Sequence, residues 1–268
     1  MFLADQHTHS DNSPDGENSV MELCEAAVKR KISSFTITDH CEIDRFREDR
    51  YATVLRQSHF DVCKAQQVFA GQVELQLGVE LGNALCDPDQ AEKVPSLYSY
   101  DLVLGSLHHP KGVEDFAFLD YSTLDVPALL RQYFDELAQM VQWGHFDVLA
   151  HLTYPLRYIV GEHHIPVDLD DYREPVERVL RLLVERGIGL EVNTSGYRQP
   201  YGRPLPDLRC VQLYHSMGGR ILTVGSDSHR TADLGANLED GLRLARRAGF
   251  QSYCVFRRRK PEFVAIDL

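Results

Sequence analysis

The chain has 268 residues, of which 43% are hydrophobic and 25% charged, a composition typical of one globular domain in the size range of α/β barrels. Its formal net charge of −12 argues against broad binding to nucleic acids or anionic membranes. The six cysteines form no C-x-x-C pair and the N-terminal residues lack the basic and apolar blocks of a signal peptide, so we expect a cytoplasmic protein with reduced cysteines and no membrane contact.

Short apolar runs with β-branched residues alternate with longer stretches of helical periodicity. Several runs are continuously apolar, as in strands buried on both faces of a parallel sheet. We predict seven strands, at Phe2–His7, Ser34–Thr38, Leu75–Glu80, Leu102–Leu107, Phe146–Ala150, Gly189–Val192 and Ile221–Gly225.

Four helices are predicted between these strands. Ser19-Val-Met-Glu22 has the pattern of a capping box and opens a helix that continues to Lys31. The last two of the other three helices each end before a glycine, as helix C-terminal signals require. These three helices cover Asp125–Trp143, Leu169–Arg186 and Leu234–Ala248.

Seven β-then-α units favour a parallel barrel over an open doubly wound sheet, although the sequence leaves that choice open. Polar side chains follow the C-terminal ends of the strands, at the rim that carries the active site in (β/α) barrels. They are His7 and His9, His40, Glu80, His108, His151, and Asp227 with His229.

Two pairs among these residues have a spacing that suits metal binding. His7/His9 and Asp227/His229 are each separated by one residue, and residues i and i+2 of a strand point to the same face. Because the pairs come from opposite ends of the chain, we expect the first and last strands to meet around metal ions. Mixed imidazoles and carboxylates without thiolate suit Zn, Mn or Fe better than Mg or Ca.

Neighbouring residues are expected to have supporting roles. Cys41 should be a packing residue, and Asp39 should support His40 or the backbone. His108 and His109 compete for one ligand position, and His109 would face away on the alternating side. Histidines in helical or loop contexts are interpreted as structural, namely His59, His145, His163, His164 and His215.

These motifs and their order resemble those of the polymerase-and-histidinol-phosphatase (PHP) family of metal-dependent phosphoesterases. The segments that carry the resemblance, beside His7-Thr-His9, are Thr38-Asp-His40, Gly78-Val-Glu80, Gly105-Ser-Leu-His108, Ala150-His151 and Ser226-Asp-Ser-His229. The resemblance covers nearly the whole chain. It implies a distorted seven-stranded (β/α) barrel, a single domain over residues 1–268, and two or three divalent metal ions.

The resemblance also implies a ligand set. One metal would take His7, His9, Glu80 and Asp227, a second would take Glu80, His108 and His151, and a third would take Asp15, His40 and His229. Two ions about 3.5–4 Å apart suit the hydrolysis of phosphate esters, which is very slow without a catalyst. We expect in-line attack by a metal-bound hydroxide without a phosphoenzyme, and the sequence identifies no catalytic side chain.

The segment Leu190–Arg198 resembles the stretch after the sixth strand of the histidinol-phosphate phosphatases in this family. It implies that Arg198 binds the substrate phosphate, with Arg157 as a second candidate, because the arginine fork can bind two phosphate oxygens. Arg203 and Arg230 are weaker alternatives. The implied reaction is hydrolysis of L-histidinol phosphate to L-histidinol and phosphate, a late step of histidine biosynthesis.

Three other interpretations stay open. The first is a PHP phosphoesterase for another substrate, such as a nucleotide. The second is a non-catalytic metal-binding module, which should have lost ligands. The third is a metal-dependent amidohydrolase, which typically needs a mid-chain lysine and an eighth barrel unit. Gln199–Pro206 matches no substrate contact and is expected to be a lid or a rigid loop. We expect a free-standing enzyme whose partner is a small phosphate ester rather than extended nucleic acid; the sequence does not predict the oligomeric state.

Overall fold

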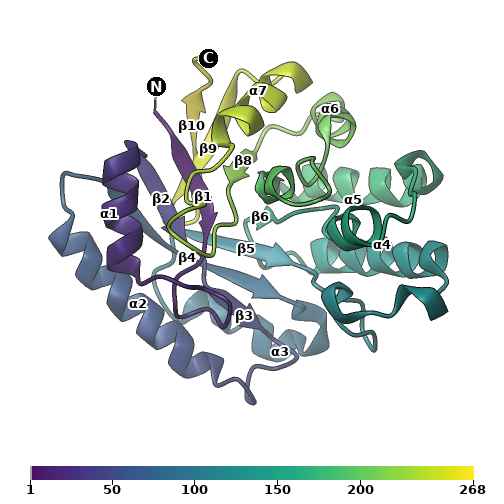
Figure 1. The fold of residues 1–268 in the computed structure, drawn as a ribbon, viewed down its shortest axis with the longest axis horizontal. Helices are drawn as coiled ribbons and strands as arrows, with labels where there is room; N and C mark the ends of the chain where they lie inside the picture. The colour runs from purple at the N-terminus through teal and green to yellow at the C-terminus, as the bar shows by residue number, and fades with distance from the viewer. Residues whose placement is uncertain (1) are drawn as a thin grey trace.

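Parallel strands form the centre of the computed structural model, which describes residues 2–268 (Figure 1). All seven predicted strands are present, each within two residues of its expected bounds. They are β1 (Ala4–Thr8), β2 (Ser34–Ile37), β4 (Glu74–Gly82), β5 (Leu102–Ser106), β6 (Val148–Leu149), β7 (Gly189–Asn193) and β8 (Leu222–Gly225). The spatial order β1-β2-β4-β5-β6-β7-β8 follows the chain, and the neighbours pair in parallel.

The sheet curves round until its two ends meet, which decides between the two predicted architectures. The N–H of Asp227 donates to the carbonyl of His7, and the N–H of His9 donates to the carbonyl of Ser228, both at 2.8 Å. A bridge between Thr8 and Ser228 lies between these bonds. The first and last strands therefore meet through the segment after β8, and the distorted barrel is confirmed.

One strand that pairs within the barrel sheet was not predicted. β3 (His40–Glu42) follows β2 after two residues and pairs in parallel with the second half of β4, where His40 lies opposite Glu80. β2 and β3 thus pair with two successive parts of the same neighbouring strand, β4. This extra pairing places His40 on the barrel rim.

Helices cover the outside of the barrel (Figure 1). They are α1 (Val20–Arg30), α2 (Tyr51–Val68), α3 (Pro88–Ala91), α4 (Val126–Trp143), α5 (Arg173–Arg186), α6 (Leu208–Ser216) and α7 (Leu238–Ala248). Short 3₁₀ turns lie at Ala84–Cys86, Val94–Ser96, Phe116–Phe118, Tyr121–Thr123, Leu169–Tyr172 and Ser195–Arg198, with a π-helix at Arg157–Glu162.

The four predicted helices are present, with two corrections at their starts. The capping box of α1 is complete, because Ser19 accepts from the N–H of Glu22 and the Glu22 carboxylate accepts from the N–H of Ser19. The helix expected from Leu169 begins with a 3₁₀ turn and becomes α5 only at Arg173. The helix expected from Leu234 begins at Leu238 instead.

An antiparallel hairpin that the sequence did not suggest closes the amino-terminal end of the barrel. It consists of β9 (Ser252–Arg257) and β10 (Lys260–Ala265). Cys254 and Phe256 of β9 are buried in a small apolar cluster with residues of β5 and β6. The N–H of Phe256 also donates to the side-chain carbonyl of Gln6 in β1, at 2.8 Å. The hairpin therefore fills the amino-terminal end of the barrel, and the cavity lies at the carboxyl-terminal rim.

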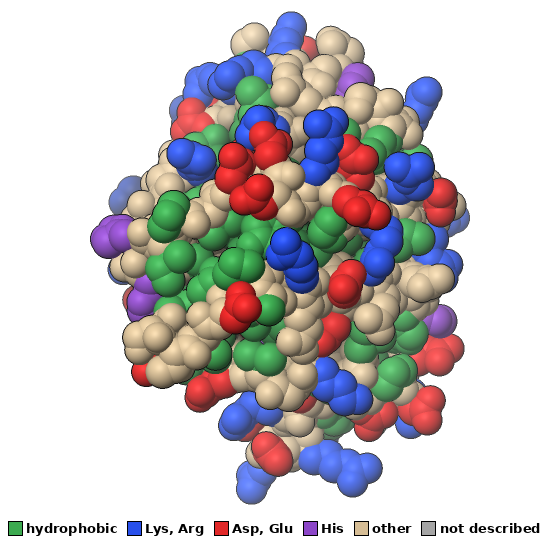
Figure 2. Space-filling view, turned by 90° about the vertical axis from the view of Figure 1, so that its right-hand side faces the viewer, with side chains coloured by type: hydrophobic (Ala, Val, Ile, Leu, Met, Phe, Trp, Pro, Cys, Tyr) green, Lys and Arg blue, Asp and Glu red, His purple; other side chains and the backbone are tan. Residues whose placement is uncertain are grey.

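Figure 2 shows the face formed by the helices at the right of Figure 1. Basic and acidic side chains are interspersed on this face around exposed hydrophobic side chains. Among residues 2–268, no helix combines the length and the apolar character needed to cross a lipid bilayer.

Candidate metal centre

Histidines and carboxylates from six strands meet at the carboxyl-terminal rim of the barrel. All nine predicted metal ligands lie here, at or just after the ends of β1, β2, β4, β5, β6 and β8. Seven of them line a cavity of about 720 Å³, which is otherwise lined mainly by acidic and aromatic side chains, and His7 and His9 are buried behind it. The structure thus brings together residues from both ends of the chain, as the motif spacing predicted.

The first group consists of His7, His9, Glu80 and Asp227, all buried. The Nε2 atoms of His7 and His9 are 3.0 Å apart, and they lie 3.4–3.6 Å from Glu80 Oε2 and Asp227 Oδ1. Ligands bound at about 2.0–2.2 Å to one ion lie about 2.8–3.6 Å from each other in tetrahedral or octahedral geometry. The four side chains therefore have the spacing of a single coordination shell.

The second group uses the other oxygen of Glu80. Glu80 Oε1 lies 2.9 Å from His151 Nε2 and 3.2 Å from His108 Nε2. Because Oε2 belongs to the first group, one carboxylate faces two sets of imidazoles. A carboxylate in this position is suited to bridge two cations.

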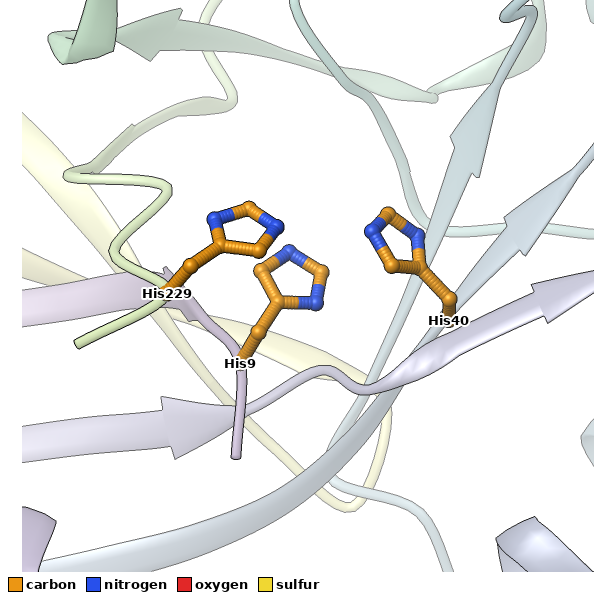
Figure 3. Close-up of side chains that lie close together, drawn as sticks. All are labelled: His9, His40 and His229. Atoms are coloured by element: carbon orange, nitrogen blue, oxygen red, sulfur yellow. The ribbon is translucent and has the colours of Figure 1, made fainter. Parts of the chain in front are cut away.

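The third group consists of Asp15, His40 and His229. Asp15 contacts His229 Nε2 at 3.1 Å and His40 Nε2 at 3.6 Å, although its side chain is 59% exposed. Figure 3 shows the ring of His9 between those of His40 and His229, and its centroid is 4.2 Å from each. His9 thus lies next to the third group as well as within the first.

Some of the converging donor atoms lack the geometry of ordinary hydrogen bonds. His40 Nδ1 is 2.8 Å from Glu80 Oε2, yet both atoms are buried and neither has a hydrogen-bond partner. The same holds for His229 Nε2, although Asp15 is only 3.1 Å away. Buried polar atoms are rarely left unpaired, because their desolvation is unfavourable. Close contacts with unsuitable angles fit side chains that share cations, so the donor set fits divalent metals.

The charges at the rim favour cation binding. Burial alone would raise the pKa of Glu80, but His7, His40 and His108 outweigh burial and hold that pKa well below its usual range. Burial likewise opposes ionisation of Asp227, and nearby His7 and other donors keep its pKa well below the usual range. Both carboxylates are therefore charged at neutral pH, which is the form that binds metal ions.

Burial has the opposite consequence for two of the imidazoles. It lowers the pKa of His9, with a further decrease from His229 and His40. It also lowers the pKa of His151, more than Glu80 raises it. Both rings are neutral near pH 7, and a neutral ring nitrogen is the form that coordinates metals.

Carboxylates that the sequence reasoning missed hold the outer nitrogens of two candidate ligands. Glu191 of β7 is 2.8 Å from His7 Nδ1, and Glu42 of β3 is 2.9 Å from His108 Nδ1. Such contacts fix the tautomer and the orientation of a metal-binding imidazole. Two signals could have revealed them: Glu191 is a charge within an apolar strand, and Glu42 is two residues from His40.

The predicted supporting residues behave as expected. The Asp39 carboxylate accepts hydrogen bonds from Ser10, Ser13 and Ser58, and Ser13 Oγ lies 3.2 Å from His9 Nδ1. Asp39 therefore supports the site through Ser13 rather than facing the cavity centre. His109 points away from Glu80 and contacts Asp44, which leaves His108 at the predicted ligand position.

The two predicted phosphate-binding arginines occupy different places. Arg157 lines the cavity beside Asp227, whose Oδ2 is 3.2 Å from Arg157 Nη2. Arg198 donates from Nη2 to the carbonyl of Ser226 at 2.8 Å and lies 3.6 Å from Asp233. Among the described residues, Arg198 is not part of the cavity lining. The structure thus brings Arg157 to the candidate ligands and leaves Arg198 outside their group.

Comparison with known proteins supports the architecture over the whole chain. A protein named probable histidinol-phosphatase from Thermotoga maritima is 27% identical over 259 residues, which cover 94% of this chain and 95% of that protein. A protein with the same name from Deinococcus radiodurans is also 27% identical, over 97% of this chain and 98% of its own length.

A solved structure has the same fold. It is the histidinol phosphate phosphatase from Lactococcus lactis complexed with zinc, L-histidinol and phosphate, with a TM-score of 0.81 and 20% identity over 97% of this chain and 98% of that one. The family model of the PHP domain matches residues 5–195, which span the barrel strands from β1 to β7 and include seven of the nine candidate ligands. The chain therefore belongs to the PHP domain family.

Proposed function

We propose that this protein is a metal-dependent phosphomonoesterase that hydrolyses L-histidinol phosphate to L-histidinol and phosphate. The observation that carries the proposal is the Glu80 carboxylate, whose two oxygens face separate groups of imidazoles beside the guanidinium of Arg157. Names of the relatives from Thermotoga, Deinococcus and Lactococcus support the reaction, since each aligns over nearly its full length.

The three groups of side chains described above would hold two or three divalent ions. Zinc is supported by the Lactococcus lactis complex, and Mn or Fe would also suit this mixture of imidazoles and carboxylates. Bound divalent cations would supply Lewis acidity, which activates water and neutralises charge on the phosphoryl group. The protein side chains hold the ions in place and contribute the positive guanidinium of Arg157.

Arg157 is the side chain that we assign to the substrate phosphate. It lines the cavity next to Asp227, one of the candidate ligands, so a phosphoryl group at the metals would lie beside it. Its charge is fixed over the whole physiological pH range. Arg157 would therefore offset the phosphate charge and orient the ester for attack.

The rest of the cavity suits a positively charged leaving group. The cavity wall away from the candidate ligands carries the acidic side chains Asp44, Asp49, Glu114 and Asp115, and Arg45 on the same wall is paired with Asp49. L-Histidinol carries an amino group and an imidazole, and both gain attraction from nearby carboxylates when protonated. Histidinol phosphate has an anionic phosphate at one end and a cationic remainder. It therefore matches the charge pattern of the cavity better than a nucleoside monophosphate does.

The interspersed charges of the helical face in Figure 2 and the net charge of −12 give little support to extended nucleic acid as a substrate.

We also propose a cytoplasmic location, because all six cysteines are free in the structure.

The proposal is tested by metal analysis together with phosphate release from a panel of esters. We expect bound transition metal and a kcat/KM for histidinol phosphate that exceeds the values for nucleoside monophosphates and glycerol phosphate. A nucleotide preferred by orders of magnitude would overturn the substrate assignment. Metal binding without any phosphate release would instead indicate a non-catalytic module.

A further inference from the structure

The loop Gln199–Pro206, whose sequence suggested a lid or a rigid loop, is fixed onto the barrel. Leu205 is buried, and its backbone exchanges two hydrogen bonds with Asn193 at the end of β7, at 3.0 and 2.9 Å. A side chain at Gly196 would collide with the carbonyl of Arg203, so the loop packs directly on that glycine. These contacts exclude a freely moving lid and place Gln199, at the start of the loop, in a defined position.

Gln199 is one of three side chains that hold the guanidinium of Arg157. Its Oε1 accepts a hydrogen bond from Arg157 Nε at 3.0 Å. Arg157 Nη2 donates to Ser195 Oγ at 2.6 Å and to Asp227 Oδ2 at 3.2 Å. These bonds use Nε and Nη2. Among residues 2–268 no hydrogen bond is made by Nη1, so its two N–H groups are available to a ligand.

Aromatic rings restrict the same guanidinium from the side. Its central carbon lies 5.0 Å from the ring centroid of Tyr154 and 5.9 Å from that of Tyr158. Only 12% of the Arg157 side chain is exposed. A long cation that is held this way loses little further conformational freedom when it binds an anion.

We infer that Gln199 is a positioning residue that orients Arg157 toward the phosphate of the substrate. This inference rests on the proposed function, in which Arg157 contacts that phosphate. A neutral amide suits the position, because its oxygen fixes the Nε–H without cancelling the charge of the guanidinium. A carboxylate there would orient Arg157 equally well but would weaken its attraction for an anion.

The test uses Gln199→Met, which keeps the side-chain length and removes the acceptor. The variant is made in the natural chain and in an Arg157→Lys background, with the exposed Gln139→Met on α4 as a matched control. For each protein we would measure kcat and KM for histidinol phosphate, the Kd of inorganic phosphate by calorimetry, metal content and Tm.

We expect Gln199→Met to raise KM and the phosphate Kd roughly 5- to 20-fold, as for loss of a hydrogen bond to a charged group. Metal content and Tm should stay unchanged, and kcat should change less than KM. In the Arg157→Lys background the same substitution should change both constants less than about twofold, because lysine has no Nε–H fork. Gln139→Met should behave as the natural chain.

Equal effects in both backgrounds would overturn the inference, because Gln199 would then act independently of Arg157. Unchanged phosphate binding in Gln199→Met would also overturn it. If the natural chain fails to hydrolyse histidinol phosphate, the proposed substrate is wrong. The calorimetric titration still decides the role of Gln199 in that case, because it requires only inorganic phosphate.

Discussion

Glu80 carries a buried negative charge between two groups of histidines. Its side chain is 1% exposed, and Oε2 has no hydrogen-bond partner among the described residues despite several close nitrogen atoms. An ionised carboxylate in such surroundings needs compensating charge, since its desolvation costs several kcal/mol. Metal cations on both sides would supply that charge, so the stability of this arrangement and its metal content are linked.

Replacing Glu80 with Gln should therefore lower metal occupancy and phosphatase activity together. The amide has the same shape but offers one neutral oxygen where the carboxylate offers two charged ones. Mass spectrometry should find fewer than the natural number of ions, with a parallel loss of kcat/KM. Glu185→Gln on the exposed side of α5 is the matched control. Full metal content in Glu80→Gln would show that the carboxylate does not bridge.

Glu191 lies behind the cavity lining and contacts two of the candidate ligands. Its Oε1 lies 2.8 Å from His7 Nδ1, while Oε2 accepts from the N–H of His151 at 2.9 Å. Replacing Glu191 with Gln should weaken metal affinity by about 10- to 100-fold, as is typical when the partner of a metal-binding imidazole is lost. Competition with a chelator of known affinity measures this effect. An unchanged metal affinity would mean that Glu191 stabilises only the local structure of β7 and does not support the metal ligands.

At the scale of single elements, the 3₁₀ turn Phe116–Phe118 presents one aromatic ring to each side. Phe116 is fully buried and packs near Tyr133 and Tyr154, whereas Phe118 is 73% exposed at the mouth of the cavity. The buried ring anchors the turn, so the exposed ring has a defined place above the acidic wall. An imidazole in the cavity could stack on Phe118.

Phe118→Ala should accordingly lower kcat/KM for histidinol phosphate about 3- to 10-fold, the range expected for one aromatic pair. Hydrolysis of glycerol phosphate, which has no ring, should be unaffected. Phe263→Ala on β10 removes a ring that is also largely exposed but distant from the cavity, and serves as the control. Equal losses for both esters would show that Phe118 does not recognise the leaving group.

Most of the predicted elements carry a local signal, and several of the missed ones depend on tertiary contacts, although α6 was missed despite its N-cap at Asp207. The strands were recognisable as continuous apolar runs, and α1 carries its own capping box at Ser19. The start of α2 follows Arg50, which adopts a left-handed conformation with φ 57° and provides no side-chain cap, so no start signal exists there. β3 has only three residues and is a strand because β4 extends beyond β2.

The candidate ligands were predictable for a similar reason. Strand ends in a parallel barrel meet at one rim, so polar residues at those ends come together regardless of loop structure. The position of Arg198 depends instead on how a 3₁₀ turn directs its side chain, and that turn aims it at the carbonyl of Ser226. Glu42 and Glu191 were missed because their signals, a carboxylate two residues after His40 and a charge within an apolar strand, do not say which imidazole each one contacts.

At the scale of the whole molecule, the C-terminal hairpin of β9 and β10 fills the amino-terminal end of the barrel, which we call its floor. Phe256 is buried against residues of β5 and β6, although it lies near the opposite end of the chain from the first strand. Arg259 in the hairpin turn also binds the Asp147 carboxylate just before β6, at 2.9–3.1 Å. The strand β9 is thus part of the core, and β10 covers it from the outside.

Phe256→Ala should lower the free energy of unfolding by about 3–5 kcal/mol, the usual effect of removing a buried phenylalanine ring. Phe263→Ala on the neighbouring strand should change it by less than about 1 kcal/mol, since that ring is 58% exposed. Urea unfolding followed by circular dichroism compares the two. Similar small effects would mean that the floor of the barrel contributes little to stability.

The meeting of the first and last strands gives the proposed ions a mechanical role as well. His7 and Asp227 are separated by about 220 residues, so an ion that binds both would act as a removable cross-link around almost the entire chain. A permanent link around a loop of that length restricts the unfolded state by roughly 5 kcal/mol. The complete first group cannot form until β8 and the segment after it are in place, so metal uptake would report that the barrel has closed. A chelator that removes the ions should therefore lower Tm. An unchanged Tm after chelation would show that closure of the barrel needs no metal.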